Sequence, residues 1–227
     1  MSNLFDEYAA DYDAALDQGI SVSGENKLFF ARGRVSCLKK CLESHGATPR
    51  LILDFGCGTG TATPFLLGLA GSKLIGLDTS EKSLRQARRV NDPARTEFLQ
   101  PSTYRPNKSV DLAFCNGVFH HVPPEEREHQ LGYIFDSLRN GGFFSFWENN
   151  PWNPGTKIVM SRIPFDRNAE TIAPPAARRM LTRAGFHVLR TDFLFIFPHF
   201  MRWLRPLETL VTQLPFGAQY QVLCRKN

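Results

Sequence analysis

The chain has 227 residues, of which 42% are hydrophobic and 22% are charged, and its formal net charge is +5. This composition is typical of one globular domain and excludes a disordered or fibrous chain. No apolar run approaches the roughly 18 residues that a membrane-spanning helix needs. The N-terminus is acidic and polar rather than basic and then apolar, so we expect a cytoplasmic protein with its five cysteines reduced.

The expected elements alternate between helices and strands. Two helices, at 3–17 and 26–44, come before the sheet, and the rest follow in chain order. Strands are expected at 51–55, 73–77, 97–99, 110–115, 143–147, 186–196 and 216–225, and helices at 63–70, about 81–90, 123–140, 175–184 and 199–213, with a long loop at 148–174. This alternation predicts an α/β fold: a doubly wound, mostly parallel, seven-stranded sheet with helices on both faces.

A glycine-rich loop follows the first strand. Gly56, Gly58 and Gly60 come after the strand and before a helix. Glycine allows a tight turn and a close approach of the backbone to a ligand, and the free N–H groups of a helix N-terminus attract anionic groups. The second strand ends at Asp78, whose carboxylate could accept both hydroxyls of an adenosine ribose.

The spacing of the loop distinguishes between two kinds of nucleotide ligand. In the dinucleotide fingerprint G-x-G-x-x-G/A, counted from Gly56, the third small residue would fall at position 61, where this chain has Thr61. A diphosphate-binding turn, and with it a nicotinamide-dependent oxidoreductase, is therefore disfavoured. A nucleoside cofactor without phosphates fits the loop better.

Three segments in order, LDFGCGTGT, GLDTS and VDLAFCNGVFHHV, resemble the successive motifs of class I S-adenosylmethionine-dependent methyltransferases. The resemblance covers about residues 5–150 and implies S-adenosylmethionine as the cofactor. It implies that Asp54 and the glycines hold the methionine part, that Asp78 and Thr79 lie at the ribose, and that Asn116 lies near the amino group and the sulfonium.

Other features of the sequence extend this resemblance or depart from it. The opening FDEYAADYDAAL is similar to the family's N-terminal lid, which implies that Tyr12 closes over the cofactor, and Arg34 could reach the methionine carboxylate. Where the family commonly has an acid near the adenine amine, this chain offers Gln100 or Ser102. We expect one methyltransferase domain over 1–227, with a helical lid at 1–45, a cofactor-binding core at 46–150 and an acceptor side at 151–227.

Candidate catalytic residues follow the fourth and fifth strands, on the side of the sheet where such folds bind ligands. A general base is useful when the acceptor is a hydroxyl that must lose a proton. We take His121 as the candidate base and Glu148 as its alternative, with packing or capping as the competing interpretation. No clustered Asp/His set indicates a catalytic metal.

The predicted activity is methyl transfer to a hydroxyl of a small molecule, glycan or natural-product intermediate. An N-methyltransferase and an inactive cofactor-binding subunit are the alternatives.

Residues 151–227 hold eleven Lys/Arg and four Asp/Glu, for a net +7, whereas 1–150 hold 16 and 18, for a net −2. Nucleic acid is disfavoured, because no recognition module or basic aromatic stripe is visible.

The C-terminal third also contains an apolar stripe. Apolar residues recur at helical spacing over 200–214, interrupted by Pro206. We expect this stripe to cover one edge of the sheet. The alternative is that it forms a wall for a hydrophobic or lipid-linked acceptor, or rests peripherally on an anionic membrane.

Overall fold

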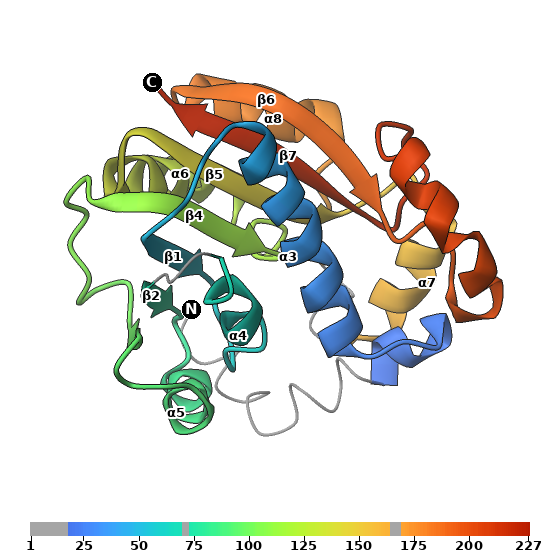
Figure 1. Ribbon diagram of the computed structural model, residues 1–227, viewed down its shortest axis with the longest axis horizontal. Coiled ribbons are helices and arrows are strands. Elements are labelled where there is room, and N and C mark those ends of the chain that lie inside the picture. Colours follow the sequence, from blue (N-terminus) through green and yellow to red (C-terminus); the bar gives the residue numbers. More distant parts are fainter. Residues whose placement is uncertain (1–17, 70–72, 164–168) are drawn as a thin grey trace.

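The computed structural model describes residues 18–69, 73–163 and 169–227, which build one seven-stranded sheet in the order β3-β2-β1-β4-β5-β7-β6 (Figure 1). The strands are β1 (Leu51–Phe55), β2 (Lys73–Leu77), β3 (Thr96–Leu99), β4 (Val110–Asn116), β5 (Leu138–Asn149), β6 (Phe186–Leu194) and β7 (Gln219–Lys226). The first five are parallel, and β7 runs antiparallel to both β5 and β6. The predicted doubly wound, mostly parallel sheet is confirmed.

Helices cover both faces of this sheet. They are η1 (Ser21–Ser23), α3 (Lys27–Ser44), α4 (Thr63–Leu66), α5 (Glu81–Val90), α6 (Pro124–Ser137), α7 (Pro154–Arg162), α8 (Pro174–Arg183) and η2 (His199–Leu210). One core cluster joins α6 and α8 to the sheet, and a second joins α3, α4 and α5 to its other face. In Figure 1, α3 accordingly crosses in front of the sheet and α8 lies behind it.

Side-chain caps fix where several helices begin. Asn26 accepts a hydrogen bond from the Phe29 N–H at the start of α3, and Ser80 accepts one from Ser83 at the start of α5. Such caps satisfy N–H groups that have no partner inside the helix. The helices expected at 26–44 and about 81–90 are therefore confirmed.

The fifth strand is longer than expected, and the helix before it is shorter. The end of the helix expected at 123–140 is wrong, since α6 ends at Ser137, and Gly141 and Gly142, which follow the expected helix, lie inside β5. The Lys226 ammonium donates to the Phe135 carbonyl at 2.6 Å and the Leu138 carbonyl at 2.9 Å. These bonds add to the one that the Leu138 N–H donates to the Phe135 carbonyl at the C-terminal cap of α6.

Two further expectations need correction. The segment 148–174 is not a continuous loop, because it contains α7, which Asn153 caps through the Thr156 N–H. The helix expected at 63–70 ends at Leu66. The helix expected at 3–17, with Tyr12, lies outside the described residues.

The apolar stripe over η2 does not cover the sheet edge. No residue of η2 is buried, and the side chains of Phe200, Trp203 and Leu210 are 79%, 73% and 79% exposed. The segment is a 3₁₀ helix with non-helical dihedrals at Met201 and with Pro206 inside it. The covering role is therefore wrong. In the described part of the chain, no helix is both long and apolar enough to cross a membrane.

Candidate cofactor and acceptor site

The glycine loop after β1 combines left-handed backbone with close packing. Gly56, Gly58 and Gly60 have φ angles of 78°, 53° and 79°. A Cβ on Gly56 would lie 2.2 Å from Val118 Cγ2, whereas a Cβ on Gly58 would meet no atom within 4 Å. Gly56 is thus required by packing against the chain, and Gly58 leaves open space on the side that faces the cavity.

Asp78 holds this loop in place. Its Oδ2 accepts a hydrogen bond from the Gly58 N–H at 2.8 Å, and its Oδ1 accepts one from Ser80 at 2.9 Å. The backbone N–H groups of Gly56 and Cys57 bond the Leu77 carbonyl at the end of β2. Asp78 therefore has a structural role that the sequence did not indicate, in addition to its expected role at a ribose.

A cavity of about 530 Å³ opens where β1, β4 and β5 end. Five of the expected site residues line it together with His121: Arg34, Asp54, Gly56, Gly58 and Asn116. The remaining described ones, Gly60, Asp78, Thr79, Gln100 and Ser102, do not line it and follow β1, β2 and β3 on the adjoining side. Except for Gly60, the structure thus brings the expected methionine-binding residues together in this cavity, and it leaves the expected adenosine-binding residues outside.

Asp54 is a buried carboxylate at the floor of the cavity. Burial, and secondly the nearby charge of Asp78, raise the pKa of Asp54 to about 7, although the Arg34 guanidinium acts in the opposite direction. Asp54 Oδ2 and Asn116 Oδ1 are both buried without a hydrogen-bond partner among the described residues. Unsatisfied buried acceptors are rare in folded proteins, so this pair is suited to receive an ammonium group from a ligand.

Arg34 forms part of the cavity wall. Its Nη1 donates to Gln219 Oε1 at 2.8 Å, and Gln219 Nε2 donates to Asn149 Oδ1 at 3.1 Å. This chain of hydrogen bonds links α3 to the ends of β5 and β7. The guanidinium is therefore fixed near Asp54, where it favours the ionised carboxylate.

The buried pair His120 and Glu148 is the feature that the sequence analysis missed. The His120 Nδ1 lies 2.5 Å from Glu148 Oε2, and Glu148 Oε1 accepts the Phe119 N–H at 2.8 Å. His120 lines the cavity, but Glu148 does not, and its side chain is 1% exposed. Glu148 is thus held against His120 and is shielded from the cavity.

His121 also lines the cavity, and its ring centroid lies 4.1 Å from that of His120. The pairing of β4 with β5 could have revealed the His120–Glu148 contact. Asn116, the last residue of β4, pairs with Trp147 in that register, so Glu148, the next residue of β5, lies beside the loop that follows β4.

One group of metal-type ligands lies away from the cavity. Among the described residues, the ligand atoms of Cys37, Cys41 and Asp192 lie within 4.8 Å of one another. The Asp192 carboxylate already accepts two hydrogen bonds from Arg190, at 2.6 and 2.5 Å. These contacts pair Asp192 with Arg190 within β6.

Comparisons with known proteins identify relatives of this chain. Residues 52–142 match the family described as "Methyltransferase domain". A trans-aconitate 2-methyltransferase of Rhodopseudomonas palustris is 29% identical over 61% of this chain and 55% of its own length. An uncharacterised methyltransferase of Bacillus cytotoxicus is 27% identical over 84% of this chain and 79% of its own. The chain spans about half the length, or less, of the first trans-aconitate 2-methyltransferases that it matches.

The fold is also that of solved structures. The crystal structure of an S-adenosylmethionine-dependent methyltransferase from Thermotoga maritima has a TM-score of 0.70 over the whole of both chains, at 17% identity. At that identity the likeness supports the fold, which is Rossmann-like.

Proposed function

We propose that the chain is a class I S-adenosylmethionine-dependent methyltransferase and that it transfers a methyl group to a hydroxyl of a small molecule. The observation that supports this most is the cavity in which unsatisfied acceptors lie beside a glycine loop and a His–Glu pair. S-Adenosylmethionine supplies the electrophilic methyl group and the leaving group. The protein's task is then to align the acceptor and to manage its proton.

The chain's own residues fit the cofactor. Asp54 and Asn116 would accept from the methionyl ammonium, and Gly58 would allow the backbone to approach the methionine part. Asp78 and Thr79 would lie at the ribose. Gln100 or Ser102 would lie at the adenine, and Tyr12 would close the site as part of the lid at 1–45. Residues 151–227 supply α7 and η2 on the acceptor side.

His120 would act as the general base. With Nδ1 bonded to Glu148, Nε2 is the ring nitrogen through which His120 would take the proton of a hydroxyl acceptor. The Glu148 carboxylate fixes the tautomer and stabilises the imidazolium that forms. His121, the base proposed from the sequence, lines the same cavity and is the second candidate.

The pair also bears on the acceptor atom. The trans-aconitate 2-methyltransferases among the relatives are named for a carboxylic acid, and a carboxylate has no proton to lose at neutral pH. A buried base held by a carboxylate would be of use for a hydroxyl. We therefore propose a hydroxyl as the acceptor group. A carboxylate or an amine as the acceptor, and a non-catalytic role in cofactor binding, are the alternatives.

The test compares three variants in a methyl-transfer assay. Acceptors with a hydroxyl or a carboxylate are incubated with the full chain and S-adenosylmethionine, and methylated product is detected by mass spectrometry. We expect His120→Ala and Glu148→Gln to lower kcat for a hydroxyl acceptor by ~10²–10⁴ and His121→Ala to lower it less. Cofactor affinity, measured by calorimetry, should change little in all three.

Two results would contradict this assignment. Full activity of His120→Ala would show that His120 is not the base. Methylation of carboxylates alone, at equal rates in wild type and variants, would show that the acceptor is an acid and that no base is used.

A further inference from the structure

Aromatic side chains from two distant segments form one wall of the cavity. Phe29 and Phe30 come from the first turn of α3, and Phe195 and Phe197 follow β6. The centroid of the Phe195 ring lies 4.8 Å from that of Phe30 and 5.9 Å from that of Phe29. We call these four residues the aromatic wall. Rings at these separations pack favourably and present a large apolar surface to a ligand.

Phe195 occupies a backbone conformation that favours glycine. Its φ is 64°, and it is a half-buried residue at the point where β6 has ended. A Cβ on Gly33 of α3 would lie 2.6 Å from the Phe195 ring, so the absence of a side chain at Gly33 makes room for it. The Ala218 N–H donates to the Phe195 carbonyl at 3.3 Å. Strain at a residue that lines a cavity is a feature of ligand-binding positions.

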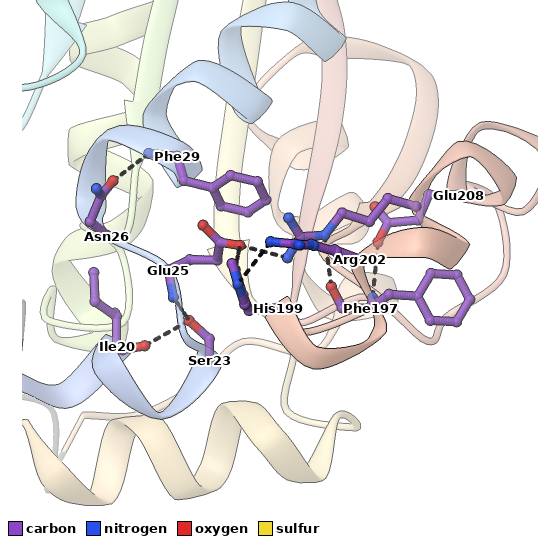
Figure 2. A network of polar contacts seen from close by, with 10 residues as sticks. Ile20, Ser23, Glu25, Asn26, Phe29, Phe197, His199, Arg202 and Glu208 are labelled. Carbon is purple, nitrogen blue, oxygen red and sulfur yellow. Dashed lines mark hydrogen bonds and ion pairs between the residues drawn. The ribbon is translucent and has the colours of Figure 1, made fainter.

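Glu25 and Arg205, two of the charged residues that line the cavity with Lys27 and Arg34, are paired with each other beside this wall. Arg205 donates to Glu25 Oε1 at 2.8 Å and to the Phe197 carbonyl at 3.2 Å, and its guanidinium carbon lies 4.5 Å from the Phe29 ring centroid. The Nδ1 of His199, the first residue of η2, lies 2.9 Å from the same oxygen of Glu25, which lies between η1 and α3 (Figure 2).

Glu25 remains ionised in this setting. Burial acts to raise the pKa of Glu25, but the hydrogen bonds from His199 and Arg205 outweigh it, so that the pKa lies below its ordinary value. Glu25 therefore neutralises Arg205 across the neutral pH range. An anionic ligand would have to compete with Glu25 for this arginine.

We propose that the acceptor is an uncharged small molecule whose aromatic ring or apolar chain packs against the aromatic wall, and that Phe195 determines this specificity. The inference rests on the proposed methyl-transfer function and names its substrate class. Small-molecule sites that are lined by aromatic and aliphatic side chains, with few polar groups, bind apolar bodies and orient them by those few groups. A small polycarboxylate would instead require several available cationic partners.

The test uses an uncharged fluorescent probe, N-phenyl-1-naphthylamine, titrated into the full chain. We expect saturable binding with increased fluorescence, and no displacement by the tricarboxylate tricarballylate. Phe195→Ala should weaken probe binding by about tenfold, because it removes the ring that packs against Phe29 and Phe30. Phe195→Gly, which suits the positive φ, is the second variant and should show the same loss.

Two exposed apolar residues outside the cavity lining serve as controls. Leu210 and Trp203 are 79% and 73% exposed, and we expect Leu210→Ala and Trp203→Ala to leave probe binding unchanged. Loss of the probe in Trp203→Ala, probe binding in both Phe195 variants as tight as in wild type, or displacement by tricarballylate would each overturn the proposal.

A parallel titration separates this proposal from the one on which it rests. S-Adenosylhomocysteine is titrated calorimetrically into the same preparations, and its affinity should be equal in wild type and in the Phe195 variants. A wild-type chain that binds the probe but not this nucleoside would contradict the methyltransferase function. A chain that binds the nucleoside but not the probe would overturn the acceptor class alone.

Discussion

At the residue scale, the pKa of Asp54 is subject to opposing effects, because burial and the charge of Asp78 raise it and the Arg34 guanidinium lowers it. Its carboxylate is buried next to Asp78 and near Arg34, and its pKa is raised to about 7. A ligand ammonium beside it would favour the ionised form. Occupation of the cavity by the methionine part of the cofactor would therefore be linked to loss of a proton from Asp54.

This linkage predicts the pH dependence of cofactor binding. S-Adenosylhomocysteine affinity should be nearly constant above pH 7 and fall by up to about tenfold per pH unit below it, because the proton must leave Asp54 before binding. Calorimetry between about pH 5.5 and about pH 8 measures this slope. Asp54→Asn should bind more weakly and without the slope, and a slope that persists in this variant would place the titrating group elsewhere.

The same raised pKa also affects the ligand-free chain. The folded state binds the Asp54 proton more tightly than the unfolded state, whose carboxyl has a pKa near the ordinary 3.8. This residue's contribution to stability is therefore fully present below that pH and is lost as the pH rises towards 7. Asp54→Asn should remove this contribution to the pH dependence of unfolding.

Several candidate site residues could be proposed from the sequence because they lie in motifs that resemble those of the methyltransferases. Asp54 in β1 and Asn116 at the end of β4 were proposed in this way, and both line the cavity. His120 could not be distinguished from His121, since adjacent residues in a loop share the same local pattern. The distinction comes from the contact of His120 with Glu148, a residue of β5 that lies 28 positions further along the chain.

At the element scale, the sequence predicted the helices and strands whose bounds depend on residues within or next to the element. The bounds of β1 and β2 follow from short apolar runs, and α5 begins after Ser80 because that side chain caps it. The end of α6 depends on Lys226, a residue about 90 positions away, and no local pattern contains that information. Asn153 and Pro154 are an N-cap and a first-turn proline, and this signal could have revealed α7.

The glycine loop leads to a prediction with a matched control. Gly58 and Gly46 both have positive φ and no atom within 4 Å of an added Cβ, but only Gly58 lines the cavity. Alanine at either position should lower stability by about 1–2 kcal/mol, because of the left-handed backbone. Only Gly58→Ala should also weaken S-adenosylhomocysteine binding, by about tenfold or more, because its methyl group occupies the ligand's space.

Urea unfolding and calorimetry measure the two effects separately. Equal cofactor affinity in the two alanine variants would show that the ligand does not approach Gly58. Equal weakening in both would show that general loosening of the fold, and not the position in the cavity, determines affinity.

At the scale of the whole molecule, the strand order explains where the site lies. In the order β3-β2-β1-β4-β5-β7-β6, β1 and β4 are central neighbours. From β1 the chain continues to β2 and β3 on one side of the sheet, and from β4 it continues to β5 on the other side. Ligands bind in the crevice at such a switch point. The cavity is found there, with α3 and α7 beside it. Alternation of strands and helices was sufficient to predict this architecture, because parallel strands require crossovers that cover both faces.

The surroundings of the apolar stripe over η2 could not be predicted from the spacing of its residues. Its spacing indicates that one face is apolar, but spacing carries no information about what the face contacts. The sheet edge at β6 pairs with β7 on one side, and η2 instead lies beyond the end of β6 with its apolar side chains exposed. Contiguous exposed apolar side chains are unusual on a monomer and mark contact surfaces.

Two tryptophans distinguish the packed part of the molecule from this exposed part. Trp147 is fully buried in the core between the sheet and α3, and its Nε1 donates to Ser145 Oγ at 2.8 Å. Trp147→Ala should lower the free energy of unfolding by about 3–5 kcal/mol, through the lost contacts and the cavity that remains. Trp203 is 73% exposed, so Trp203→Ala should change it by less than about 0.5 kcal/mol.

Urea unfolding followed by circular dichroism gives both values without relying on tryptophan fluorescence. If Trp147→Ala does not fold, Trp147→Phe provides the measurement, since it keeps an aromatic ring while removing the hydrogen bond to Ser145. A Trp203→Ala variant that loses about 2 kcal/mol or more would contradict the exposed placement of η2. If that loss grew with protein concentration, the stabilising contact would come from a second copy of the chain, because only an intermolecular contact contributes by mass action.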